Sequence, residues 1–211
     1  MGKFKPVTEG HKKRARKIAI EKLVCSARFQ QAFNDGSLDG WLNSLKIDPN
    51  AIIPPQDARI KIVRVKFRQD RPWQQAVTAA GPNTGNNESV RVVGDQYPST
   101  GTEEVEENFI LLNYPKGNGN WDRALGWGEG AGLKNTMPRE VFAIGEHHPK
   151  LHEQFGLNPM CVVATTARTF NTVTFIGRGV CSVWWRNSDR NVSLLGAAGL
   201  LQDCAWLVFR M

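Results

Sequence analysis

The chain has 211 residues, and 41% of them are hydrophobic, which is enough for one domain with its own core or for one domain with a small appendage. Its net charge of +7 is concentrated in residues 1–22, where eight Lys and Arg residues accompany two acidic residues. No apolar run approaches the ~20 residues of a membrane-spanning helix, and the basic start lacks the apolar region of a signal peptide. We therefore expect no membrane insertion, no signal peptide, and a location in the cytoplasm or in a virus particle.

The N-terminal segment, residues 1–46, is predicted to form a helical hairpin. Within residues 9–34, apolar residues repeat at the i, i+3, i+4, i+7 spacing of one helix face. Asp35-Gly36 ends this helix, and Ser37 can cap a second, shorter one. Nucleic acid or an acidic partner could bind the basic side chains of this segment, which are Lys12, Lys13, Arg14, Arg16 and Lys17. A nucleic-acid-binding protein is therefore the alternative function.

Residues 58–211 are predicted to form the main domain. Helices are expected at residues 72–80, from Trp121 onward with Asn120 as its cap, and at residues 138–145. Strands are expected at residues 60–67, 90–93, 108–113, 160–166, 172–176, 180–185, 190–195 and 205–210. Because helices come first and strands dominate later, the fold class is predicted to be α+β rather than a regular βαβ array.

The titratable cluster of the sequence, which is also its metal candidate, is Glu146-His147-His148-Pro149-Lys150-Leu151-His152-Glu153. His148 and His152 are four residues apart, as in helical metal-binding pairs. Pro149 disfavours the helical conformation at His148, however, so the two side chains would not share a helix face. We expect a polar turn followed by an exposed helix, and we keep a metal-dependent enzyme at His147, His148 and His152 as a third, weaker hypothesis.

Other catalytic and cofactor motifs are missing from the sequence. The glycine-rich stretches 117–119 and 126–132 match neither a phosphate-binding loop nor a dinucleotide-binding turn, and no Gly-x-Ser-x-Gly motif occurs. The cysteines are far apart and form no Cys-x-x-Cys pair, so they are expected to be free, buried thiols: Cys25, Cys161, Cys181 and Cys204. We therefore expect no enzyme, no cofactor and no bound metal.

The last 31 residues, 181–211, combine two kinds of sequence. Val183-Trp184-Trp185 and Trp206–Phe209 have the aromatic and β-branched character of buried strands. Between them, residues 189, 191, 193 and 195 alternate with residues 190, 192 and 194, and in a strand these two sets face opposite sides. One side can therefore pack on the core while the other contacts a ligand. Trp184 and Trp185 must likewise face opposite sides, so one of them is exposed beside Arg186, where it would be a typical contact hot spot.

The C-terminal half resembles a family of variable proteins made by diversity-generating retroelements, from small-genome bacteria and their viruses. Within residues 60–211 the resemblance runs through Trp121–Leu125, Pro138–Gly145, His148–His152, Val162–Thr166, Cys181–Trp185, Arg190, Leu194 and Trp206–Phe209. Two features depart from the family pattern: the small residues Gly196 and Ala197 replace larger framework residues, and residues 167–180 form a longer stretch.

The resemblance implies a C-type-lectin-like domain whose last segment, about residues 181–211, displays a diversified ligand-binding surface. The implied variable positions are Arg186, Asp189, Asn191, Ser193, Leu195, Ala198, Leu201, Gln202 and Asp203. With Trp184 and Trp185 they complete the expected ligand-binding set. The sequence therefore predicts a non-enzymatic recognition protein that binds a protein or a glycan, with Trp185 or Trp184, together with Arg186, as the main anchors.

Overall fold

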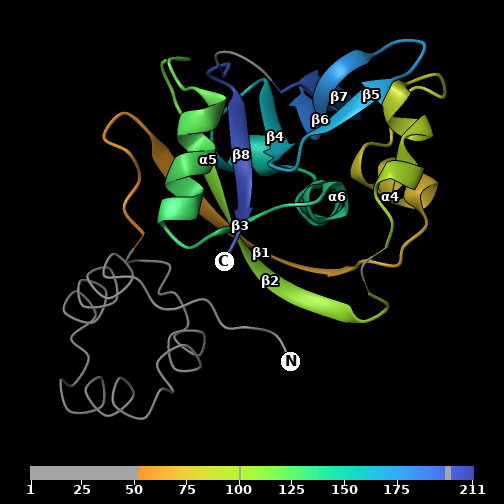
Figure 1. The fold of residues 1–211 in the computed structure, drawn as a ribbon, viewed down its shortest axis with the longest axis horizontal. Helices are drawn as coiled ribbons and strands as arrows, with labels where there is room; N and C mark the ends of the chain where they lie inside the picture. Colours follow the sequence, from red (N-terminus) through yellow and green to blue (C-terminus); the bar gives the residue numbers. More distant parts are fainter. Residues whose placement is uncertain (1–51, 100, 198–200) are drawn as a thin grey trace, which may run out of the picture. The chain divides into compact units, whose positions relative to one another are not determined.

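A mixed sheet of eight strands runs through the computed structural model, which describes residues 52–99, 101–197 and 201–211 (Figure 1). The strands are β1 (Arg59–Arg68), β2 (Glu104–Asn113), β3 (Lys134–Asn135), β4 (Met160–Ala164), β5 (Arg168–Asn171), β6 (Ile176–Arg186), β7 (Asp189–Gly196) and β8 (Ala205–Arg210). The helices are α4 (Trp73–Ala80), α5 (Trp121–Gly130), α6 (Pro138–His147) and α7 (Leu151–Gln154), with 3₁₀ turns η2 (Ser89–Val92) and η3 (Gly94–Gln96). The predicted α+β class is confirmed.

The sheet brings the C-terminal strand into its centre. The strand order is β1-β2-β8-β4-β6-β5, with β3 beside β8 and β7 beside β6. The pairing of β4 with β8 is parallel and the other pairings are antiparallel. Gly179 of β6 pairs with β5 through Arg168 and with β7 through Gly196, so β5 and β7 lie on opposite sides of β6. The β6–β7 hairpin therefore forms one end of the sheet.

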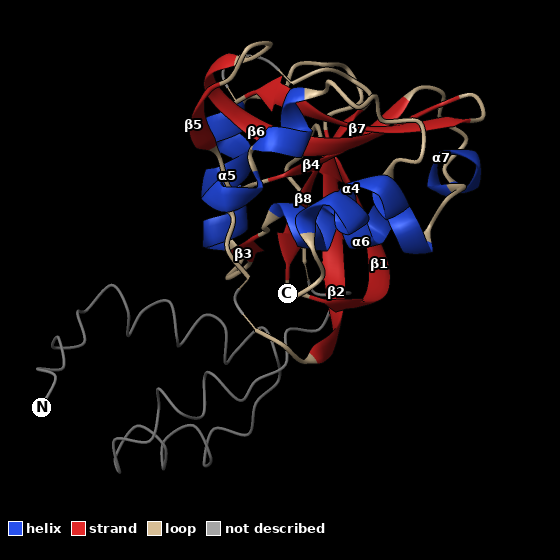
Figure 2. Ribbon diagram, turned by 90° about the vertical axis from the view of Figure 1, so that its right-hand side faces the viewer, coloured by secondary structure: helices blue, strands red, loops and turns tan. Residues whose placement is uncertain are grey.

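One face of the sheet packs against α4 and α6. Val65 of β1, Val183 of β6 and Val208 of β8 belong to a single buried cluster with residues of both helices. Trp73 at the start of α4 stacks on Tyr97 with 5.6 Å between ring centroids and meets Phe142 of α6 edge-on at 5.2 Å. Figure 2 shows α4 and α6 side by side across this part of the sheet. This aromatic layer forms the main core.

Helix α5 covers the opposite face, over β8, and Figure 1 shows α5 and α6 on opposite sides of that strand. Asn120 caps α5 as predicted, because its side-chain oxygen accepts hydrogen bonds from the N–H groups of Asp122 and Arg123. Gly128 lies inside the helix, and a Cβ there would come within 2.4 Å of the Phe209 ring. The glycine thus allows α5 to approach β8 closely, which explains a residue that weakens helices.

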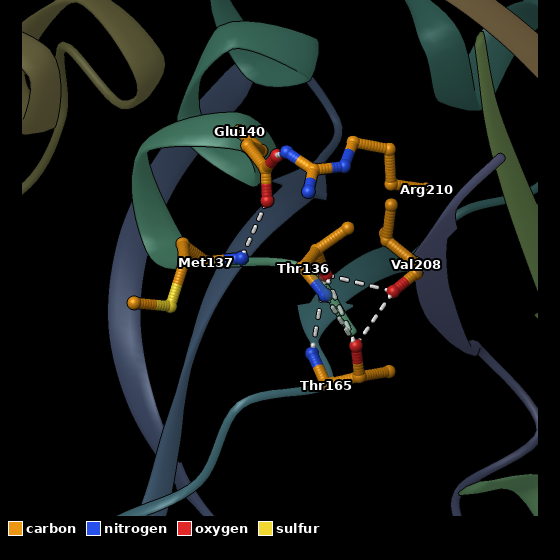
Figure 3. A network of polar contacts seen from close by, with 6 residues as sticks. All are labelled: Thr136, Met137, Glu140, Thr165, Val208 and Arg210. Carbon is orange, nitrogen blue, oxygen red and sulfur yellow. Dashed lines mark hydrogen bonds and ion pairs between the residues drawn. The ribbon is translucent and has the colours of Figure 1, made fainter. Parts of the chain in front are cut away.

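A buried polar network holds the start of α6 against β8 (Figure 3). The hydroxyls of Thr136 and Thr165 both donate to the Val208 carbonyl, at 2.7 and 2.9 Å. Glu140 is only 2% exposed and accepts hydrogen bonds from the Met137 N–H at 2.6 Å and from Arg210 at 2.9 Å. Burial raises the pKa of Glu140, and these two donors oppose the rise. The network fixes the helix relative to the central strand.

Two expected strands are wrong. Residues 89–92 form the turn η2, and Trp73 donates its indole N–H to the Val90 carbonyl at 2.7 Å, which occupies a group that a strand neighbour would need. Residues 172–175 form the tight connection between β5 and β6, where Thr172 and Phe175 bond each other through backbone and side-chain groups. No helix within the described ranges is both long and apolar enough to cross a membrane. The predicted helical hairpin, residues 1–46, lies outside the described residues.

Candidate recognition surface

The β6–β7 hairpin arranges most of the predicted ligand-binding residues in two facing rows. Opposed residues in an antiparallel pair point to the same side of the sheet. The opposed pairs are Arg186 with Asp189, Trp184 with Asn191, Ser182 with Ser193, and Val180 with Leu195. We call Trp184, Arg186, Asp189, Asn191, Ser193 and Leu195 the outer face. The outer face is on the same side of the sheet as α5. Trp184 pairs with Cys161 of β4, and Cys161 pairs with Ala205 of β8, so these three side chains point to the same side.

The other side of β7 packs inward, so the predicted alternation is confirmed. Val192 is 1% exposed and Leu194 packs partly buried against the main core. Arg190 sends its guanidinium to the Ala79 carbonyl at the end of α4, at 3.0 Å. These side chains fix β7 in place and leave residues 189, 191, 193 and 195 on the outer face.

The free edge of β7 is covered by residues 81–84, which directly follow α4. The backbone N–H of Arg190 donates to the Asn83 side chain, and the Asn83 N–H donates to the Arg190 carbonyl, at 3.0 and 3.1 Å. The Val192 N–H donates to the Thr84 hydroxyl at 2.8 Å. A Cβ at Gly81 would lie 2.6 Å from the Val192 nitrogen, so the close approach requires glycine.

The outer face presents two charged side chains, Arg186 and Asp189, that have no partner among the residues the structure describes. Arg186 and Asp189 are exposed and directly opposed, yet no ion pair or hydrogen bond joins either side chain to another described residue. Trp184, Asn191 and Leu195 are half-buried. Ser193 contacts the Ser182 hydroxyl at 3.2 Å. The face therefore combines an aromatic side chain, one cation and one anion on a backbone held by uninterrupted strand pairing.

Trp185 is not a surface anchor, and the expectation that it contacts a ligand is wrong. It is 1% exposed, and its indole N–H donates to the Pro149 carbonyl at 3.0 Å. Its strand partners, Met160 and Arg190, face the α6 side of the sheet. The prediction that the two tryptophans face opposite sides of the sheet is confirmed, and the strand register shows that Trp184 is the one on the outer face.

The loop from β7 to β8 adds the remaining predicted residues that the structure describes. Gln202 and Asp203 are exposed and Leu201 is half-buried. The Leu201 N–H donates to the carbonyl of Gly119, just before α5, at 2.9 Å, which brings the loop to the α5 side of the sheet. Ala198 lies outside the described residues.

Asn113, which the sequence analysis missed, anchors the end of this loop. The residue is fully buried at the end of β2, and its amide donates to the carbonyls of Asp203 and Ala205 at 2.6 and 2.9 Å. Its amide oxygen accepts a 2.9 Å hydrogen bond from Arg59. The sequence feature that could have indicated this role is the position of a polar residue directly after the apolar run Phe109-Ile110-Leu111-Leu112.

The three histidines that the structure describes, His147, His148 and His152, do not assemble into a metal site. His147 is exposed, His148 lies 3.3 Å from the Arg64 carbonyl, and His152 is 7% exposed. Within residues 52–99, 101–197 and 201–211, no three His, Cys, Asp or Glu side chains are grouped closely enough to hold a metal ion. The geometry thus gives no support to the metal-dependent enzyme hypothesis.

The described cysteines are free, as expected. Cys161 and Cys181 are fully buried, and burial raises the pKa of both thiols. Cys204 is half-buried, and burial also raises the pKa of its thiol. Because the thiolate is the reactive form, burial makes these thiols less reactive.

Some predicted features lie beyond the described residues. They are Cys25 and the basic side chains Lys12, Lys13, Arg14, Arg16 and Lys17. Comparison of the whole chain with known proteins finds no matching family model, no matching curated protein and no matching solved structure.

Proposed function

We propose that the chain is a non-enzymatic recognition protein with a C-type-lectin-like domain, which binds a protein or glycan ligand through the outer face and the β7–β8 loop. In this proposal the ligand-contacting residues are Trp184, Arg186, Asp189, Asn191, Ser193, Leu195, Leu201, Gln202 and Asp203. The resemblance to the variable proteins of diversity-generating retroelements gives the same set, apart from Trp184 and with Ala198 added.

The observation that supports the proposal best is the register of β6 and β7. It puts residues 184, 186, 189, 191, 193 and 195 on one side of the sheet, while their neighbours Trp185 and Val192 are in the core. A surface of this kind can change its side chains without changing its backbone, because strand pairing and the inner face carry the fold.

The chemistry of the surface also fits recognition. Arg and Trp are the residue types most enriched at energetic centres of interfaces. Arg186 and Asp189 have no partner among the described residues, so a ligand can pair with them without breaking a contact within the chain. Trp184 can contribute apolar area with few rotatable bonds.

A binding screen with matched variants tests the proposal. The full chain is applied to protein and glycan arrays, and each ligand is tested again with Arg186→Ala/Asp189→Ala. The control is Arg64→Ala/Glu106→Ala, which removes one cation and one anion that form an exposed ion pair between the neighbouring strands β1 and β2. We expect ligands whose affinity falls at least tenfold, by about 1.4 kcal/mol or more, with the first variant. The same ligands should bind the control variant with unchanged affinity. Ligands that respond equally to both variants, or to neither, would argue against this surface.

The genome offers a separate test of the link to retroelements. If the segment is diversified, a near-copy of its coding sequence lies beside a reverse transcriptase gene, with mismatches confined to adenines. Those mismatches should fall in codons for residues on the outer face and in the loop. Mismatches concentrated in codons for Trp185, Val192 or Phe209, which are buried, would contradict the proposed display of variable residues.

A further inference from the structure

A groove of about 480 Å³ lies between the end of β1, the start of α4 and one face of α6. None of its lining residues belongs to β6, β7 or the β7–β8 loop, so it is separate from the outer face. Phe67, Ala76 and Phe142 give it apolar walls, and all three are buried residues of the main core. The groove is therefore partly apolar, although most of its rim is charged.

Most of the charges in the groove cancel in pairs. Lys66 contacts Glu104 at 2.6 Å, Arg68 contacts Asp70 at 2.7 Å, and Arg71 contacts Glu146. Among the described residues that line the groove, these three carboxylates are the only acidic side chains. Each of them is therefore already matched by one cation.

Arg139 is the cation that remains. It is half-buried, its guanidinium lies 5.2 Å from the centre of the Trp73 ring, and among the described residues it donates only to the backbone carbonyls of Arg71 and Tyr97. Its Nη2 has no acceptor among the described residues. Burial lowers the pKa of Arg139, and no carboxylate among the described residues offsets this effect. A partly desolvated positive charge without an anion favours a ligand that supplies one.

The start of α4 adds to the positive potential of the groove. Pro72, just before the helix, and Gln75, its third residue, line the groove, and the first turn contains no acidic residue. The N-terminal end of a helix carries a partial positive charge. Arg139 and this helix end therefore favour the same sign of ligand charge.

We propose that this groove binds a small organic monocarboxylate, with its carboxylate at Arg139 and its hydrocarbon part against the apolar walls. One excess positive charge matches one carboxylate. A phosphate dianion would bring a second negative charge close to Asp70, Glu104 and Glu146, and it has no hydrocarbon part to contact Phe67 and Phe142.

Two glutamine substitutions separate ligand binding from stability of the fold. Gln75→Glu puts a negative charge into the groove at a helix position where acidic residues are stabilising. Gln74→Glu is the matched control, because it makes the same change one residue away. Gln74 does not line the groove and instead contacts Arg91.

The test is a calorimetric titration of the full-length protein with sodium butyrate. Sodium chloride keeps the ionic strength constant. We expect saturable binding to the wild type and to Gln74→Glu, and binding weakened about three- to tenfold by Gln75→Glu, since a like charge a few ångströms away opposes the carboxylate. Arg139→Met, which keeps an apolar contact with Trp73, is expected to abolish binding.

Several results would overturn the proposal. Absence of saturable butyrate binding to the wild type would exclude the site. Equal affinities of the Gln75→Glu and Gln74→Glu variants would show that butyrate binds elsewhere, even if Arg139→Met fails to fold. Tighter binding of inorganic phosphate than of butyrate would assign the groove to a different anion.

Discussion

Neighbouring tryptophans at positions 184 and 185 show how strand geometry assigns different roles to identical side chains. Trp185 is enclosed by the core and bonds the Pro149 carbonyl, whereas Trp184 is half-buried on the outer face. We expect Trp185→Ala to lower the free energy of unfolding by about 3–5 kcal/mol, as is usual for large buried aromatics. Trp184→Ala should cost less than half as much. Urea unfolding measures both values, and equal losses would contradict the assignment of faces.

Glycines within α5 provide a second test at the residue scale. A methyl group at position 128 would meet the Phe209 ring at 2.4 Å, whereas at position 126 it would have no neighbour within 4 Å. Gly126→Ala should therefore stabilise the protein by up to about 1 kcal/mol through helix propensity alone. Gly128→Ala should destabilise the protein, because the steric clash with Phe209 costs more than the gain in helix propensity. Thermal unfolding of the two variants distinguishes them, and equal shifts would show that α5 does not contact β8 closely.

At the scale of elements, β7 depends on residues that are more than a hundred positions away in sequence. Thr84 accepts a hydrogen bond from the Val192 N–H. Replacing it with the nearly isosteric valine leaves that buried N–H without a partner, so Thr84→Val should lower the free energy of unfolding by about 1–3 kcal/mol. Thr169→Val, on exposed β5, is the control and should have little effect. Similar losses for both variants would indicate that residues 81–84 do not support β7.

The attachment of α6 to β8 predicts a particular pH dependence. Because burial raises the folded-state pKa of Glu140 above the usual value of 4.5, the native state holds this proton more tightly than the unfolded state. The contribution of Glu140 to stability is thus fully present below pH 4.5 and is lost as pH rises through the folded-state pKa. Glutamine cannot titrate, so the stability of the wild type relative to Glu140→Gln should decrease as pH increases. Unfolding of both proteins in urea over this pH range measures the difference, and an increase with pH would mean that Arg210 dominates.

At the scale of the whole molecule, local sequence patterns predicted the helices and strands better than they predicted which strands pair in the sheet. β1, β6, β7 and β8 follow from apolar or alternating segments, and Asn120 correctly marked the start of α5. The position of β8 between β2 and β4 depends on pairing between distant segments, which no local signal contains. For the same reason the sequence separated the two sides of β7 but missed Asn113, Asn83 and Thr84, whose partners are distant.

The central claim is that the outer face of β7 and β6 contributes little to the fold and is free to serve recognition. The most direct measurement is the free energy of unfolding of Arg186→Ala/Asp189→Ala/Asn191→Ala beside that of Val192→Ala, a single change on the inner face. We expect the triple variant to stay within about 1 kcal/mol of the wild type, as surface substitutions do, and Val192→Ala to lose more than that. A triple variant that is less stable than Val192→Ala would contradict the account.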